Sequence, residues 1–185
     1  MVDDYVIQVL NGNVDAYRKV VSALKGKAHT VAVSIVDDDQ AAKDVVQTAF
    51  IKAYEKLNSF NFNSAFETWF MRIVLNEAYM QKRKTQRTAK VIDQNQLPPV
   101  GKQPEADKDL NSASQKESIR QTMSELTAEQ SLALKLFYLE EYSIQTIAEV
   151  MEWTESKVKV TLHRARKSFK DKLTHRLGYK KEDLL

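Results

Sequence analysis

The sequence has no cysteine, and this absence excludes several kinds of chemistry. A chain without thiols has no disulfide framework, no thiolate zinc site and no cysteine nucleophile. The chain opens Met1-Val2-Asp3-Asp4, which is acidic where a secretion signal is basic and then apolar, so we expect no such signal. No run approaches the roughly 18 uninterrupted apolar residues of a membrane span. We therefore expect a soluble, cytoplasmic protein.

Glycine and proline are scarce, with four and three among 185 residues. Globular chains usually hold roughly 7% and 5% of these residues, and a chain so poor in helix breakers is usually mostly helical. The hydrophobic share of 43% is typical of a globular rather than a disordered chain. A formal net charge of +3, from 28 basic and 25 acidic side chains, excludes little by itself. We predict an all-α fold.

All three prolines lie in residues 97–111, together with a glycine, scattered charges and no apolar period. This composition predicts a flexible linker, and helical patterns flank it on both sides. We therefore predict two small helical domains, residues 1–92 and 117–185, joined by a linker of residues 93–116. Domains of this size can fold alone.

Local signals set the helix boundaries of the N-terminal domain. Gly12 follows an apolar helix-like stretch and suits the left-handed residue that ends a helix. Residues 30–36 alternate and are rich in β-branched side chains, but a single strand would have no partner, so we expect helix there. The carboxylates of residues 37–39 are expected to cap the next helix. A calcium loop is disfavoured, because Thr48 stands where the bidentate glutamate should be.

A helix over residues 40–57 would carry two different faces. Its core stripe comprises Val46, Ala49, Phe50, Ala53 and Leu57. The opposite face, which we name the docking face, comprises Asp44, Gln47, Thr48, Ile51 and Glu55. An isoleucine ringed by polar groups suggests a site for a partner helix, although a lone exposed isoleucine is also common. The residues alone leave both readings open.

The helix from Phe66 to about Arg87 carries aromatic and basic side chains beside its apolar arc. The arc comprises Phe66, Phe70, Ile73, Val74 and Met80. The adjoining side, which we name the single-strand face, comprises Trp69, Arg72, Asn76, Tyr79 and Arg83. Flat rings among cations suit unpaired bases and phosphates, and a basic run from Lys82 to Lys90 without any acid strengthens this reading. The alternative is an amphipathic helix whose Trp and Tyr are half-buried core with wet polar ends.

The C-terminal pattern predicts a helix-turn-helix. Thr127 and Gln130 have the spacing of a capping box at the start of an apolar helix. Ser143 can cap a short helix over residues 144–151, and a turn of three residues leads to a long helix over residues 155–176. Two helices joined in this way, the second longer and basic, are typical of duplex DNA readers.

The outward side of that long helix, which we name the duplex face, is basic. It comprises Lys157, Lys159, Val160, His163, Arg164 and Lys167. Between Ser156 and Arg176 there are eight Lys or Arg and one acid, so we favour DNA over the alternative of a surface helix in an all-α adaptor. The three histidines have no metal-ligand spacing. No phosphate loop or nucleophile–base pair occurs, so we expect no enzyme, no cofactor and no small-molecule substrate.

Several strings, in order and spacing, resemble extracytoplasmic-function (ECF) sigma factors of the sigma-70 family. Asp44-Val-Val-Gln47-Thr-Ala-Phe50 resembles the family's polymerase-binding helix, and Phe66-Glu-Thr-Trp69-Phe-Met-Arg72-Ile-Val-Leu-Asn76 its promoter-melting helix. Three further strings resemble its second DNA-binding domain: Leu126-Thr-Ala-Glu-Gln130, Ile147-Ala-Glu149 and Val158-Lys-Val-Thr-Leu-His-Arg-Ala-Arg166. The likeness spans nearly the whole chain outside the linker.

The resemblance implies a sigma factor that directs promoter recognition, DNA melting and transcription initiation, with core RNA polymerase and promoter DNA as partners. The docking face would bind a coiled coil of the polymerase clamp. The single-strand face and the loop of residues 59–65, here named the capture loop, would hold the minus-ten element with one base turned out. The duplex face would read the minus-thirty-five element. The loop residues implied are Ser59, Asn61, Phe62 and Asn63.

Some features depart from the family pattern or leave alternatives. Glu152 stands where the family's turn often has glycine, which implies strain of about 1 kcal/mol if that residue is left-handed. Met80 and Thr161 replace positions that are often acidic and basic. An inhibitory anti-sigma factor is a common partner in this family. The alternative function is a helix-turn-helix regulator acting on duplex DNA without polymerase, which would leave the docking and single-strand faces unexplained.

Overall fold

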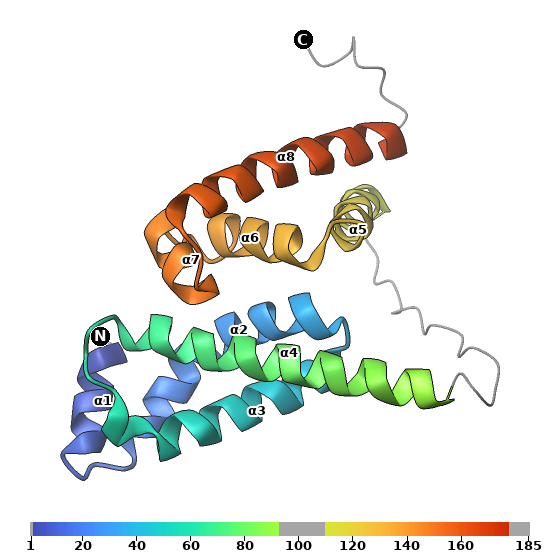
Figure 1. Cartoon of the computed structure of the whole chain (residues 1–185). Coiled ribbons are helices and arrows are strands. Elements are labelled where there is room, and N and C mark those ends of the chain that lie inside the picture. The colour runs from blue at the N-terminus through green and yellow to red at the C-terminus, as the bar shows by residue number, and fades with distance from the viewer. Residues whose placement is uncertain (1, 93–109, 178–185) are drawn as a thin grey trace.

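The computed structural model describes residues 2–92 and 110–177, which form helices and the turns that join them, with no strand among them (Figure 1). The helices are α1 (Val2–Leu10), α2 (Ala16–Val36), α3 (Asp39–Glu55), the 3-10 turn η1 (Leu57–Ser59), α4 (Phe66–Ile92), α5 (Leu110–Ser124), α6 (Ala128–Tyr138), α7 (Ile144–Met151) and α8 (Glu155–Leu177). The all-α prediction is confirmed. Residues 30–36 form the end of α2, because the helix buries Val31, Ala32 and Ile35 on one side.

The predicted linker falls partly outside the described residues. Residues 93–109 are not described, whereas residues 110–116 belong to the first half of α5. In Figure 1, α5 to α8 lie above α1 to α4.

The N-terminal half is a bundle in which α2, α3 and α4 pack against one another and α1 closes one end. Its centre is aromatic: the rings of Phe50 on α3 and Phe70 on α4 stack with centroids 4.4 Å apart. Tyr17 on α2 donates a hydrogen bond of 2.7 Å to the carbonyl of Phe50. Burial raises the pKa of Tyr17, so this hydroxyl stays a donor that ties α2 to α3.

The helix ends follow the local signals in the sequence. Gly12 has a φ of +96° after α1, as the left-handed position requires. The Asp38 side chain caps α3 by accepting from the Ala41 amide at 2.6 Å. At the start of α4, the Phe66 amide donates to Asp3 Oδ1 at 2.8 Å. This last cap comes from α1, so the acidic N-terminus of the chain helps to fix the position of α4.

The C-terminal half contains the predicted helix-turn-helix. The capping box of Thr127 and Gln130 begins α6, and Ser143 caps α7 by accepting from the Thr146 amide at 3.0 Å. Between α7 and α8, Glu152 is left-handed, with φ 54° and ψ 42°. The turn therefore has the conformation for which glycine is favoured, with glutamate in its place. Buried Val158, Leu162 and Ala165 form the core side of α8.

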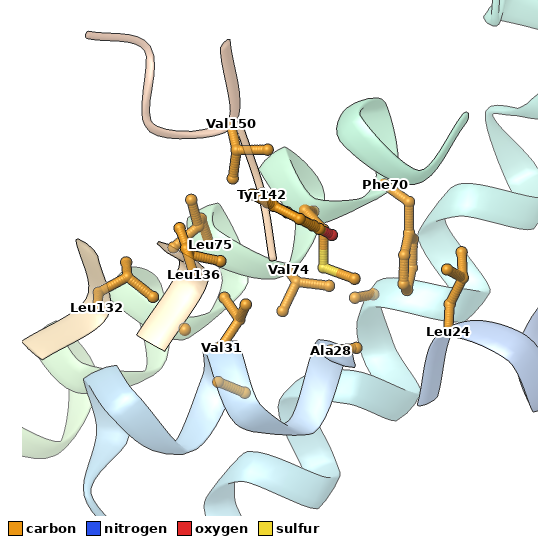
Figure 2. Close-up of a cluster of buried hydrophobic side chains, with 14 of the residues drawn as sticks. Leu24, Ala28, Val31, Phe70, Val74, Leu75, Leu132, Leu136, Tyr142 and Val150 are labelled. Carbon is orange, nitrogen blue, oxygen red and sulfur yellow. The ribbon is translucent and has the colours of Figure 1, made fainter. Parts of the chain in front are cut away.

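The two halves share one hydrophobic cluster, an arrangement that the sequence left open. The side chains of α6 meet α2, and those of α7 meet α4. Figure 2 shows Leu132 and Leu136 of α6 beside Val31 of α2, with Val74 and Leu75 of α4 close by. The buried cluster is therefore continuous across the two halves.

Candidate protein and nucleic-acid interfaces

The docking face is one exposed side of α3. All five of its side chains are exposed: Asp44, Gln47, Thr48, Ile51 and Glu55. Ile51 is 52% exposed and lies among these polar side chains, opposite the packed side of the helix. Lys52, at the edge of this face, pairs with Glu77 of α4 at 2.6 Å and anchors α3. The face is thus a rigid polar surface with an apolar centre, suited to a partner helix.

The capture loop joins η1 to α4 and is held by an aromatic stack. Phe60 is buried, and its ring centroid lies 5.4 Å from that of Phe66 and 5.3 Å from that of Trp69. Phe62 is exposed and left-handed, with φ 58°, and its ring lies 4.6 Å from Phe60. A bulky residue with positive φ stores backbone strain of about 1–3 kcal/mol.

Polar groups line the rest of the loop. Asn61 Oδ1 accepts from the Asn63 amide at 3.2 Å, and the Ser59 hydroxyl donates to the Lys56 carbonyl at 2.6 Å. The side chains of Ser59, Asn61 and Asn63 are exposed. The loop therefore exposes the Phe62 ring and several hydrogen-bonding groups, and its buried Phe60 packs on Trp69.

The single-strand face runs along α4 from Trp69 to Arg83. Trp69, Arg72 and Tyr79 are half-buried, whereas Asn76 and Arg83 are exposed. Burial, and then the charge of Glu129, raise the pKa of Tyr79, so its hydroxyl remains protonated. The half-burial of both rings is what the amphipathic-helix alternative also predicts, so exposure alone does not separate the two readings.

The predicted apolar arc of α4 was wrong at one residue. Met80 is 58% exposed, whereas Phe66, Phe70 and Val74 are fully buried. The buried side of α4 also includes Met71, Leu75 and Ala78. At about 100° per residue the centre of that side lies close to Val74, so Met80 falls well outside it.

The C-terminal half covers part of the single-strand face. Arg72 Nε donates a hydrogen bond of 2.7 Å to the Glu149 carbonyl at the end of α7. A cavity of about 230 Å³ lies between the two halves at this point. It is lined by Arg72, Leu75, Asn76, Tyr79, Glu129, Val150, Met151, Glu152 and Trp153. Sequence reasoning missed this contact, because no local pattern indicates how two separate halves pack.

The duplex face is open along α8. All six of its side chains are exposed: Lys157, Lys159, Val160, His163, Arg164 and Lys167. At its N-terminal end Lys157 Nζ lies 3.7 Å from the centroid of the Trp153 ring and 3.8 Å from a carboxylate oxygen of Glu129. The remaining cations project from one side of the helix, where base edges and phosphates of a duplex can be reached.

One basic residue of α8 has a structural contact. Arg166 Nε donates to the Tyr138 hydroxyl at 2.8 Å, and its guanidinium lies 5.3 Å from the centroid of the Phe137 ring. Arg166 therefore holds α8 onto the end of α6.

Within residues 2–92 and 110–177, no group of three or more acidic or histidine side chains is arranged to hold a metal ion. None of the helices in the same residues is long and apolar enough to cross a membrane.

Two family models match the chain, "Sigma-70 region 2" over residues 20–88 and "Sigma-70, region 4" over residues 116–169. Among curated relatives, the "RNA polymerase sigma-H factor" of Pseudomonas aeruginosa is 31% identical and covers 88% of this chain and 89% of its own length. The "RNA polymerase sigma factor YlaC" of Bacillus subtilis is 30% identical, covering 85% and 87%. The "ECF RNA polymerase sigma factor SigW" of the same species is 27% identical, covering 94% and 97%.

Solved structures show the same fold. The sigma factor RpoE of Bartonella quintana, in complex with the anti-sigma factor NepR, superposes with a TM-score of 0.69 at 23% identity, over 85% of this chain and 96% of that one. CnrH in complex with the cytosolic domain of CnrY has a TM-score of 0.68 at 20% identity, covering 92% and 96%. The matches extend over both helical halves.

Proposed function

The chain belongs to the ECF group of the sigma-70 family of RNA polymerase sigma factors, and we propose that its three exposed faces divide the work of such a factor. As a sigma factor it binds core RNA polymerase and directs promoter recognition and transcription initiation. Sigma factors are regulatory subunits rather than catalysts. The role of each face is inferred from its geometry.

The docking face binds core polymerase in this proposal. Ile51 supplies the apolar centre, and Asp44, Gln47 and Glu55 supply hydrogen-bonding groups around it. Full burial of an isoleucine contributes about 1.5–3 kcal/mol, and Ile51 is 52% exposed, so covering it with a helical partner contributes about half of that. Polar neighbours that keep their hydrogen bonds then fix the orientation of the partner helix.

The capture loop and the single-strand face hold the non-template strand of the minus-ten element. Phe62 and Trp69 offer rings on which a base can stack, and stacking of this kind contributes about 1–3 kcal/mol per base. Arg72 and Arg83 supply cations for phosphates, and Asn76 supplies donor and acceptor groups for a base edge. Captured bases offset the unstacking and unpairing of the duplex, so melting needs no catalytic residue.

The duplex face reads the minus-thirty-five element in the major groove. The N-terminal turns of α8 carry Lys159, His163 and Arg164, whose donors can reach base edges, while Lys157 and Lys167 lie near the phosphates. In this arrangement residues 1–92 and 117–185 act as separate domains on the promoter, joined by the predicted linker, whose last residues, 110–116, form the start of α5. The protein works in the cytoplasm, where polymerase is.

A further partner is an anti-sigma factor. One structurally similar protein was solved with an anti-sigma factor, and another was solved with the cytosolic domain of a second protein. We propose that this chain also has an inhibitory partner of that kind, and that it has no metal, cofactor or small-molecule substrate.

One observation carries the proposal: a single chain combines an exposed apolar docking site, an aromatic and basic strand site and a basic helix-turn-helix. The test is transcription in vitro with core polymerase and this protein as the only added factor, on a library of genomic fragments. Initiation at a defined set of sites is expected. A protein that binds duplex fragments but never initiates with core polymerase would instead be a helix-turn-helix regulator.

A further inference from the structure

Val160 is an apolar residue at the centre of the duplex face. On the buried side of α8, Val158, Leu162 and Ala165 are 0%, 1% and 0% exposed. At about 100° per residue, Val160 lies about 170° from the centre of that side. The residue is 48% exposed, so its side chain points away from the body of the C-terminal half.

Within the described part of the chain, no packing accounts for a valine at this position. Val160 is not among the hydrophobic residues that pack against the buried cluster, whereas Phe169 on the other side of the same helix is. Valine is also a weaker helix former than alanine, because its branched side chain loses rotamer freedom in a helix. Packing and helix stability therefore do not explain the side chain, which is available to a partner of the duplex face.

Polar side chains surround Val160 on the outward side of α8. Four exposed ones lie within about 60° of it on the helical projection: Lys157, His163, Arg164 and Lys167. Lys157, which precedes Val160 by one turn, lies against the Trp153 ring, with Nζ 3.7 Å from the ring centroid. A recognition helix meets base edges with its N-terminal turns, and Val160 is the central outward position of those turns.

The edges of base pairs in the major groove are almost entirely polar. All four bases present hydrogen-bond donors or acceptors there, and thymine adds the one apolar group, its C5-methyl. A valine side chain neither donates nor accepts, so against a polar edge it would displace water without replacing the hydrogen bonds. Against a C5-methyl both partners are apolar, and their contact removes apolar surface from water. The chemistry of Val160 therefore matches one group in the groove.

We propose that Val160 is a specificity-determining residue, which selects a thymine in the minus-thirty-five element by contact with its C5-methyl group. This inference rests on the proposed role of the duplex face, and it names the base that the centre of that face reads. The donors of Lys159, His163 and Arg164 bind the neighbouring polar edges in this arrangement. Burial of one methyl group corresponds to about a fourfold difference in affinity.

Deoxyuridine gives a direct test, because it differs from thymidine only in lacking the C5-methyl group. The probe is a duplex that the full-length protein selects from a random pool, so its isolation does not depend on polymerase. Each thymine of either strand is replaced in turn, and affinity is measured by fluorescence anisotropy. We expect at least one position at which the replacement weakens binding about fourfold. If no thymine position shows a loss, the proposal is overturned.

A Val160→Ala variant should remove the same interaction from the protein side. Its affinity for the thymine duplex should fall about fourfold, and deoxyuridine at the sensitive position should then cause no further loss. Val160→Ile keeps the apolar bulk and should keep the sensitivity to the methyl group. Val14→Ala makes the same change at a residue that is 57% exposed and outside the three faces, so it should alter neither value. If the sensitive position stays equally sensitive in Val160→Ala, another residue contacts the methyl group and the assignment is wrong.

Stability and salt dependence separate base reading from a structural effect of the substitution. Alanine is the better helix former and the position is exposed, so the thermal midpoint of Val160→Ala should not fall. The slope of affinity against salt concentration should also stay unchanged, because no phosphate contact is lost. A lower midpoint together with an altered slope would mean that the substitution disturbs α8 rather than a base contact, and would overturn the proposal.

Methylated cytosine carries the same C5-methyl group and is the second source of this chemistry. Methylation of each cytosine of the probe in turn is expected to give no gain in affinity. A gain at one cytosine that disappears in Val160→Ala, with no thymine position sensitive, would assign Val160 to 5-methylcytosine and overturn the assignment to thymine.

Failure of the inference and failure of the proposed function give different results. If the duplex face does not read DNA, the selection will enrich no sequence and Arg164→Ala will leave duplex affinity unchanged. If only the role of Val160 is wrong, a sequence will be enriched and Arg164→Ala will weaken binding, while no methyl group of the probe couples to Val160.

Discussion

The two proposed nucleic-acid faces differ in composition and in exposure. The single-strand face combines half-buried rings with cations on α4, and α7 covers part of it. The duplex face consists of six exposed side chains on α8, four of them Lys or Arg. Bases stack on apolar rings, and such rings in water favour burial against something. Phosphates are bound by charged side chains, and charged side chains are stable when they are exposed to solvent. A strand-capturing surface is therefore the one that another part of the protein can cover.

Loss of the polymerase contact should have the largest effect, because it should abolish transcription while the duplex face keeps its affinity for DNA. Asp44→Lys combined with Ile51→Glu should abolish binding to core polymerase and promoter-specific transcription. The duplex face lies on another helix, so binding to duplex DNA should persist. Both positions are exposed, so the thermal midpoint should change little. Co-purification of the variant with core polymerase would refute the docking face.

The next effect tests the strand-capturing face alone. Trp69→Ala should impair open-complex formation by about 1–3 kcal/mol, the contribution of one stacked base, and leave duplex binding near wild type. Reactivity of unpaired thymines with permanganate measures the first property, and fluorescence anisotropy the second. Because Trp69 also packs on Phe60 and Phe66, Trp69→Phe is the control that keeps a ring. Equal losses in both assays would contradict a melting role.

A smaller effect is expected on the duplex face. Lys167→Ala removes one exposed cation, so duplex affinity should fall similarly for all sequences and the salt dependence should weaken by about one counterion. Titrations at several salt concentrations measure the slope. Lys25→Ala, on the exposed side of α2, should change neither quantity. A sequence-dependent loss with an unchanged slope would mean that Lys167 contacts a base.

Local features of this fold could be predicted from the sequence, because their causes are local. The cap at Asp38, the capping box at Thr127 and the left-handed Gly12 each depend on a few neighbouring residues, and all three are present. Helix periodicity also placed the docking face and the duplex face on exposed sides of α3 and α8. Which DNA or polymerase groups they contact remains a prediction.

The errors and omissions have non-local causes. Met80 was expected in the core, but the buried side of α4 depends on where α2 and α3 lie, which the helical projection does not contain. Arg166 is one of the eight basic residues whose number favoured DNA, yet it binds Tyr138 across the helix-turn-helix. The packing of the two halves depends on Leu132 and Leu136, which look like an ordinary apolar stripe until a second partner for α6 is known. Such pairings join segments about 100 residues apart, as in the bond from Lys135 to Ser34.

The smallest effect concerns the turn that connects the two faces. Glu152 precedes the helix that carries the duplex face and follows the helix that covers the single-strand face. A residue with a side chain pays about 1 kcal/mol for this left-handed backbone, and glycine removes that cost. Part of the resulting stabilisation is lost again, because glycine makes the unfolded chain more flexible. Glu152→Gly should therefore raise the free energy of unfolding by about 0.5 kcal/mol, measured by urea denaturation. Glu152→Gln keeps the side chain and removes the charge, so it should show no such gain. If glutamine stabilises as much as glycine, the cause is repulsion from Glu129 across the cavity rather than backbone strain.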